Sequence, residues 1–358
     1  MFDINAKKNE RYPAVGHGSP PFVVNHFDYW RHGLAVDTKL PLASAMPTLI
    51  AVGGGKGGVG KSIISANFSA ILAQFGYRVL VIDMDLGCSN IHSHFGVSMP
   101  KKSLADFILS QRMSFRDVIL PAPVPGVAFV AGGREEQWND VLDQSRKCLS
   151  PLWHEIVMSK QQYKVDFVIL DLGAGTHRYT MDFFCASHMG MITVLPEPTS
   201  IENAYVFLKM VLWNLIEAVG KHLQMPEQAL DVQAALNDMS GKSLNQGYAF
   251  CLRHLQPSYP EIIQMLGQVI RSRYIGLLLN QTRDQSDMDI GNSMEHICQR
   301  YFGLQSRYLG HLNYDQAVLK SLRNRRLLVS DFPHSSIVKR LVIAASQTLN
   351  LLGVQRRG

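Results

Sequence analysis

A glycine-rich loop between an apolar run and a stretch of helical periodicity constrains this chain more than any other feature. Residues 53–62 read Gly-Gly-Gly-Lys-Gly-Gly-Val-Gly-Lys-Ser, after the apolar run 49–52 and before apolar residues at helical spacing in 64–75. A strand, such a loop and a helix form a phosphate-binding loop. Glycines suit this chemistry because backbone N–H groups can meet phosphate oxygens with no Cβ in the way. The motif predicts a nucleotide site made by Gly55, Lys56, Gly57, Gly58, Val59, Gly60, Lys61, Ser62 and Ile63.

Two side chains of the loop have predicted roles toward the phosphates. Lys61 is expected to reach the β- and γ-phosphates, and the Ser62 hydroxyl is expected to hold Mg²⁺. The start of the following helix adds partial positive charge and unpaired N–H donors. A glycine-rich hinge without a ligand remains the alternative interpretation.

Lys56 is a second lysine inside the same loop. A buried cation is costly unless it meets an anion. The run Lys-Gly-Gly-Val-Gly-Lys-Ser, residues 56–62, resembles the deviant Walker A loop of the MinD/ParA ATPases. This resemblance implies that ATP is the nucleotide and that Lys56 reaches across a homodimer to the partner's phosphates. The spacing alone shows only a second lysine near the phosphates.

Acidic residues end two further apolar runs, 77–83 and 165–171. Ligands of open α/β sheets lie at the carboxyl ends of strands. The family resemblance implies that Asp83 and Asp85 form a switch, that Asp85 positions or activates the attacking water, and that Asn90 belongs to the same switch. Asp85 is also a candidate magnesium ligand. An Asp-x-Asp after a strand is otherwise a common turn device.

Asp171, at the end of the second run, is predicted to be the Walker B carboxylate that holds Mg²⁺, usually through water. The resemblance places a second switch after it, at Gly173 to Thr176, with Gly175 as a switch residue. The family usually has proline where this chain has Gly173. Glycine makes the loop less rigid than proline would.

Two later segments extend the resemblance. Residues 196–205, Pro-Glu-Pro-Thr-Ser-Ile-Glu-Asn-Ala-Tyr, are similar to the corresponding segment of the FlhG/FleN branch of MinD-like proteins. Asn280 ends the apolar run 274–280 and matches the family position that contacts adenine. A turn residue is the alternative for Asn280.

The element order predicts an α/β fold with a doubly wound and mostly parallel sheet flanked by helices. The resemblance implies that this fold is of the P-loop MinD/ParA type. Residues 1–46 are interrupted by prolines and glycines and read as an irregular extension, a possible docking segment, before an ATPase domain of residues 47–358. Compact relatives have a short connection where this chain has about 218–272, which predicts a helical insertion. Further helices are expected at 101–117, 147–161 and 335–352.

Composition limits the functional classes. The chain has 358 residues and a net charge of +6, with no uninterrupted apolar run of transmembrane length. The amino terminus lacks a signal-peptide core. Five scattered cysteines without metal-ligand spacing fit a reducing cytoplasm.

The positive charge is concentrated near the carboxyl end, where residues 320–358 contain eight basic side chains and one acid. Arg323, Arg325 and Arg326 are close enough to form a patch for nonspecific DNA, although a solvated face explains them equally well. No separate amphipathic helix of the membrane-anchoring kind follows the final predicted helix.

The prediction is therefore a slow Mg²⁺-dependent ATP hydrolase, stimulated by an unknown protein partner, that switches as an ATP-dependent homodimer. The FlhG-like segment implies placement or counting of flagella or another cellular assembly. A ParA-like partition ATPase and a nucleotide-gated scaffold with little hydrolysis remain alternatives. A metal-cluster carrier usually needs a Cys-x-x-Cys pair, which this chain lacks.

Overall fold

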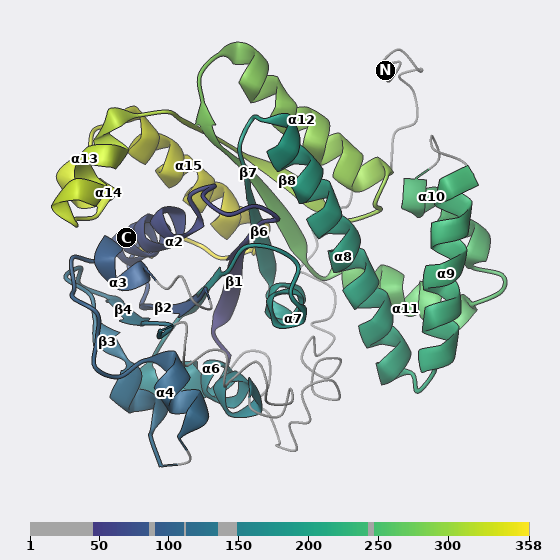
Figure 1. The fold of residues 1–358 in the computed structure, drawn as a ribbon, viewed down its shortest axis with the longest axis horizontal. Coiled ribbons are helices and arrows are strands. Elements are labelled where there is room, and N and C mark those ends of the chain that lie inside the picture. Colours follow the sequence, from purple (N-terminus) through teal and green to yellow (C-terminus); the bar gives the residue numbers. More distant parts are fainter. Residues whose placement is uncertain (1–45, 86–89, 111, 135–148, 243–246, 358) are drawn as a thin grey trace.

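The computed structural model describes residues 46–85, 90–110, 112–134, 149–242 and 247–357, and within them the chain forms one eight-stranded sheet (Figure 1). The strand order is β3-β4-β2-β5-β1-β6-β7-β8, and every pair is parallel except β3–β4. The predicted fold class is confirmed. The strands are β1 Thr48–Gly53, β2 Val79–Met84, β3 Leu120–Pro121, β4 Val127–Val130, β5 Phe167–Leu172, β6 Met189–Val194, β7 Tyr274–Thr282 and β8 Ser306–Asn313.

Helices cover both faces of the sheet, as right-handed crossovers between parallel strands require. Strands β2, β5 and β6 are buried along their whole length because both faces are covered. One face packs against α2 (Lys61–Gln74), α3 (Ile91–His94), α13 (Gln316–Asn324), α14 (Leu328–Asp331) and α15 (Ser336–Leu351). The opposite face packs against α4 (Leu104–Leu109), α6 (Ser150–Tyr163), α7 (Arg178–Ala186), α8 (Pro198–His222) and α12 (Gln285–Arg300).

Three helices form a lobe on the distal half of α8, at the right of Figure 1: α9 (Pro226–Lys242), α10 (Gly247–Leu255) and α11 (Pro260–Arg271). Aromatic rings join this lobe to the core, since Tyr248 of α10 lies 5.2 Å from Trp213 and 5.3 Å from Tyr301, centroid to centroid. The predicted helicity of this region is confirmed. Its status as an insertion relative to compact relatives stays a prediction.

The helix predicted over 101–117 is wrong in extent. The structure has α4 and then a separate 3-10 helix, η2 (Phe115–Val118). Ser103 and Ser114 each begin a helix with a capping box, closed by Asp106 and Asp117, and two such starts break the segment in two. The elements β3, α3, α7 and α12 were not predicted.

Two of the eight carboxyl-terminal cations are engaged in packing. The Arg356 guanidinium lies 3.6 Å from the centroid of the Phe75 ring, and Arg357 forms a 3.0 Å ion pair with Asp166. Arg356 and Arg357 therefore contribute to packing within the chain and are not part of the predicted patch of Arg323, Arg325 and Arg326. Among the helices of the described residues, none combines the length and the apolar content that crossing a membrane requires.

Candidate nucleotide-binding site

The glycine-rich loop lies where β1 ends and α2 begins, at the carboxyl edge of the parallel strands. Gly60 is the N-cap of α2 and has a φ of 95°, a left-handed conformation that favours glycine. It offers no capping side chain, so the first N–H groups of α2 remain available to an anion. A Cβ on Gly55 would come within 2.2 Å of the Asn203 carbonyl oxygen, so this position also requires glycine. The structure thus gives a physical reason for the glycines.

Lys61 is buried, and the charges of two carboxylates act on it. Only 6% of the residue is exposed. Burial lowers the pKa of Lys61, and the negative charges of Asp171 and Asp85 oppose that shift. An ammonium group held in this way compensates an anion that enters the loop.

Asp171 is fully buried at the end of β5, directly beside Asp83 in the β2–β5 register. Burial and the Asp83 charge raise the pKa of Asp171 to about 7, while hydrogen bonds from Ser62 and Ser65 and the charge of Lys61 oppose the rise. The Ser65 hydroxyl donates to Oδ1 at 2.8 Å. Oδ2 has no hydrogen-bond partner among the described residues.

These residues fit Mg²⁺. An unpaired carboxylate oxygen beside the Ser62 hydroxyl is the hard oxygen donor set that this ion prefers. Within the described ranges, no group of three or more His, Cys, Asp or Glu side chains is arranged so that it could hold a metal ion by itself. The small donor set suits Mg²⁺ held partly by nucleotide phosphates, and not a cage built from protein alone.

The two acids of the predicted first switch have different positions. Asp83 is fully buried, and its carboxylate accepts the backbone N–H groups of Asp85 at 3.1 Å and of Ile91 at 3.0 Å. Asp83 therefore holds both ends of the segment from β2 to α3 through hydrogen bonds. This is the structural role in a turn that the sequence analysis gave as the alternative for an Asp-x-Asp after a strand. Residues 86–89 of that segment lie outside the described residues.

Asp85 faces the loop and the second switch. Burial raises the pKa of Asp85, and Lys61 opposes the rise. A Cβ on Gly173 would lie 3.0 Å from Asp85 Oδ1, so glycine here leaves room for the carboxylate. Gly175, with a φ of 89°, donates its N–H to the Gly54 carbonyl at 3.2 Å and ties the second switch to the loop. Asn90 is exposed and is the N-cap of α3.

Lys56 contacts its own chain. Its Nζ lies 3.1 Å from Glu197 Oε2 and 3.1 Å from Thr199 Oγ1, at the start of α8. The sequence analysis gave residues 196–205 only as a segment similar to the FlhG/FleN branch and did not assign Glu197 or Thr199 to the loop. The action of Lys56 across a dimer stays a prediction.

Asn280 is buried beside the loop, and its amide group bonds to the backbone on both sides. Nδ2 donates to the Val59 carbonyl at 2.8 Å, and Oδ1 accepts the N–H of Gln281 at 2.9 Å. Gln281 has a φ of 60°, a left-handed conformation uncommon for a side chain of this kind. Asn280 thus braces the loop, and its contact with adenine stays a prediction.

A hollow of about 210 Å³ opens next to Asn280. Gly58, Gly60 and Asn280 line its near end, together with Tyr314 from the loop after β8. Tyr314 was not predicted as a site residue, and the Arg283 guanidinium lies 5.4 Å from the centroid of its ring. An aromatic ring beside the loop can stack on a nucleotide base. The far end of the hollow is lined by apolar side chains of α13, α14 and α15: Val318, Leu319, Leu322, Leu328, Ile337 and Leu341.

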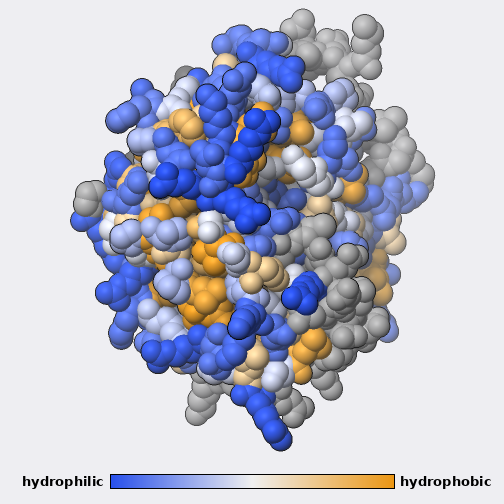
Figure 2. Space-filling model, turned by 60° about the vertical axis from the view of Figure 1, so that its left-hand side comes forward, coloured by the Kyte–Doolittle hydropathy of each residue, from blue (hydrophilic) through white to orange (hydrophobic). Residues whose placement is uncertain are grey.

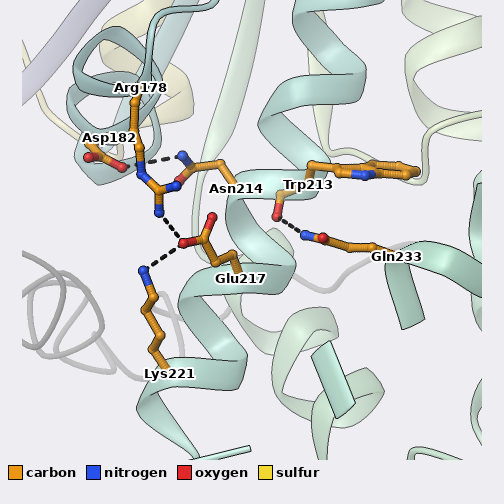
Figure 3. Close-up of polar contacts among 7 residues, drawn as sticks. All are labelled: Arg178, Asp182, Trp213, Asn214, Glu217, Lys221 and Gln233. Atoms are coloured by element: carbon orange, nitrogen blue, oxygen red, sulfur yellow. Dashed lines mark hydrogen bonds and ion pairs between the residues drawn. The ribbon is translucent and has the colours of Figure 1, made fainter. Parts of the chain in front are cut away.

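Polar contacts connect α7, which follows the second switch, to α8 and through it to α9 (Figure 3). Arg178 and Lys221 both pair with Glu217, the latter at 2.6 Å. Asn214 donates to Asp182 at 3.3 Å, and Gln233 of α9 donates to the Trp213 carbonyl at 2.9 Å. No sequence motif pointed to these contacts, because all of them except the Glu217–Lys221 pair join residues far apart in the chain.

The three predicted DNA-contacting arginines lie together at the carboxyl end of α13, and all are exposed. Arg326 forms a 3.3 Å ion pair with Asp331. Arg325 ends the helix with a φ of 51°. They are grouped as predicted, but none of them lines the hollow beside the loop.

Comparison with known proteins identifies relatives of this arrangement. The family described as the CobQ/CobB/MinD/ParA nucleotide binding domain matches residues 50–328. The antiactivator FleN of Pseudomonas aeruginosa is 36% identical over 166 residues, 46% of this chain and 56% of that protein. The flagellum site-determining protein YlxH of Helicobacter pylori is 33% identical over 161 residues, 45% of this chain and 52% of that protein.

A solved structure supports the fold independently. The septum site-determining protein MinD of Pyrococcus horikoshii, complexed with Mg-ADP, is 19% identical, and the alignment covers 86% of this chain and 98% of that one with a TM-score of 0.56. The chain spans about half the length of the curated relatives it matches.

Proposed function

Because this chain belongs to the CobQ/CobB/MinD/ParA family of nucleotide-binding domains, we propose that it is a Mg²⁺-dependent ATPase that acts as a nucleotide-switched homodimer. The observation that carries this proposal is the buried Lys61 at the start of α2, directly after the loop, where the charges of Asp85 and Asp171 oppose the effect of burial on its pKa. Burying charged groups lowers the stability of the fold, so such groups are common at sites that bind a charged ligand.

In this mechanism the loop N–H groups and Lys61 bind the phosphates and stabilise the charge that develops as the terminal phosphoryl group leaves. Ser62 and Asp171 would hold Mg²⁺, which would neutralise charge on the phosphates when bound. Asp85 orients the attacking water and accepts its proton. Asp83 and Asn280 keep the first switch and the loop in position through the backbone contacts described above.

Dimerisation would change the partners of Lys56. In one chain this lysine is held by Glu197 and Thr199. In an ATP-bound dimer, Lys56 would leave those partners and contact the phosphates of the nucleotide bound to the second subunit. The triphosphate carries more negative charge than one exposed carboxylate. The contact with Glu197 is exposed and weak enough to be exchanged.

The relatives point to a spatial role. FleN is named an antiactivator and YlxH a flagellum site-determining protein. The corresponding role for this chain is a cytoplasmic regulator that places or counts a cellular assembly, with flagella as the first candidate. An unknown protein partner would stimulate hydrolysis. Residues 47–358 would be the ATPase domain, about 218–272 a helical insertion, and 1–46 an extension whose first 45 residues lie outside the described part.

Light scattering of the full chain tests the switch. With ATP and Mg²⁺ the wild type should form dimers, and Lys56→Ala should bind ATP but stay monomeric and inactive. A control variant, Lys101→Ala, changes an exposed lysine away from the loop and should dimerise normally. Full ATP-dependent dimers of Lys56→Ala would disprove the role across the dimer.

A second candidate function is ATP-dependent binding of nonspecific DNA, which the exposed Arg323, Arg325 and Arg326 favour. Phosphate contacts of this kind weaken steeply with salt. Replacing the three arginines by Glu should abolish DNA retardation and leave ATP turnover unchanged. Absence of DNA binding by ATP-loaded protein at low salt would remove this candidate.

A further inference from the structure

The surface of α13 is unusual because bulky apolar side chains are exposed on it. Tyr314, just before the helix, is 49% exposed, and Leu319 and Leu322 on the helix are 45% and 40% exposed. The buried residues of α13 are the small Ala317 and Ser321. The helix packs chiefly against the short α14, so it covers little of the core with its own leucines.

These apolar side chains line a hollow. Leu319 and Leu322 form its far end together with Leu328 of α14 and Ile337 and Leu341 of α15. The lining is mostly apolar, which suits an apolar side chain from outside. Figure 2 turns the side of the molecule with α13 and α14 toward the viewer and shows hydrophobic surface interrupted by hydrophilic side chains.

Cations on α13 form a rim beside this hollow, whose lining includes Asp315 and none of these cations. Lys320, Arg323 and Arg325 are exposed and have no carboxylate partner within the ranges that the structure describes. Arg326 is also exposed and pairs with Asp331. An occupant that buries the leucines therefore comes close to three uncompensated positive charges, and negative charge on the occupant would be favourable.

We propose that the apolar far end of this hollow and the cationic rim of α13 dock an acidic amphipathic segment of a partner protein. Bulky apolar side chains of the segment enter the hollow between α13, α14 and α15, and flanking Asp or Glu residues meet Lys320, Arg323 and Arg325. This is the helix-in-groove type of recognition, with charge setting the orientation.

Shape and chemistry favour a protein segment over the other polyanions. A phosphate backbone would use the cations and leave Leu319 and Leu322 in water. A flat lipid surface meets side chains that protrude, whereas these leucines line a concave site. The chain's own residues 1–45 carry five basic and four acidic residues, so they offer little charge complementarity to a basic rim.

The test selects ligands without assuming a sequence. Random 14-residue peptides displayed on phage are selected on the immobilised full chain, and enriched peptides are synthesised and titrated in solution. We expect sequences that combine Leu, Ile or Phe with Asp and Glu. The double variant Leu319→Gln/Leu322→Gln should weaken their binding by about tenfold or more, because two apolar contacts are lost.

Matched controls separate this surface from general stickiness. Leu230→Gln changes a leucine on α9 that is 62% exposed, and it should leave peptide binding unchanged. Arg323→Glu/Arg325→Glu should weaken binding and flatten its salt dependence, whereas Arg253→Glu on the exposed side of α10 should not.

Three results would overturn the proposal: no enriched peptide, peptides that bind the double leucine variant as well as the wild type, or duplex DNA or anionic phosphatidylglycerol vesicles that bind through α13 while peptides do not. ATP turnover is measured on the same variants. Because peptide binding requires no hydrolysis, loss of the docking surface and failure of the proposed ATPase function would be seen separately.

Discussion

The charged groups at the two edges of the parallel sheet differ in how they are partnered. At the carboxyl edge, Lys61, Asp85 and Asp171 are brought together with their pKa values displaced by burial, and one oxygen of Asp171 has no hydrogen-bond partner in the described residues. At the amino edge, Asp166 accepts the N–H of Arg78 at 2.9 Å and pairs with Arg357. His188 there accepts the N–H of Leu49 at 3.0 Å.

This difference distinguishes groups that are available to a ligand from groups that stabilise the fold. A buried charge without a full set of protein partners lowers stability, and a ligand can recover that cost when it binds. A fully partnered group contributes to stability and gains nothing from a ligand. Substitutions at the carboxyl edge should therefore change binding or turnover, and substitutions at the amino edge should change only the free energy of unfolding.

The largest effect is expected for Lys61→Ala. Removing the buried ammonium leaves the phosphates and two carboxylates uncompensated, so nucleotide affinity should fall by roughly a hundredfold or more. Titration with a fluorescent ATP analogue measures this loss, and circular dichroism checks that the variant is folded. Near-normal affinity in a folded variant would show that the carboxyl edge does not depend on this charge.

Asp85→Ala should separate binding from chemistry. If Asp85 acts on the attacking water, turnover should fall by roughly a hundredfold or more while ATP binding persists. Phosphate release measures turnover, and light scattering should show a persistent ATP-bound dimer. Asp289→Ala, at an exposed position of α12, serves as the control. Normal turnover by Asp85→Ala would remove Asp85 from the reaction.

His188 makes a pH test of the amino edge. Burial and the nearby Arg273 charge lower the pKa of His188 to about 4, below its unfolded value of 6.5. The unfolded chain therefore binds more protons between those values, so this contribution to stability is present above pH 6.5 and is lost as pH falls toward 4. The expected loss is about 3 kcal/mol.

Urea unfolding at several pH values measures this contribution as the difference between the wild type and His188→Gln. Gln removes the titrating imidazole and keeps a polar side chain of similar length. Asp171 works in the opposite direction, since its raised pKa makes the free protein less stable as pH rises from about 4 to 7. Parallel pH profiles of wild type and His188→Gln would contradict the assignment to His188.

The sequence predicted those parts of this molecule that depend on residues close together in the chain. A strand, a loop and a helix within 48–74 fix the phosphate-binding loop, and acids at strand ends predict where carboxylates gather. The separation of α4 from η2 was missed because two overlapping apolar patterns resemble one helix. The sequence did not predict the roles of Tyr314 and Glu197 or the hydrogen bonds of Asp83. These depend on which distant segments the order of the strands brings together.

The smallest effect is expected for Arg357→Gln. The Arg357 side chain is 57% exposed, pairs with Asp166 at 3.0 Å and lies 4.8 Å from the centroid of the Tyr77 ring. An exposed ion pair contributes little, so the free energy of unfolding should fall by less than about 1 kcal/mol. Raising the salt concentration should shrink the difference between variant and wild type, because the pair is screened.

ATP affinity and turnover of Arg357→Gln should match the wild type, because the residue lies at the amino edge. Arg356→Gln, which loses a contact with Phe75, is the variant for comparison. Urea midpoints and phosphate release measure the two properties on the same samples. A turnover change larger than the stability change would mean that the amino edge communicates with the loop through α2 and β2, and the separation between the two edges would then fail.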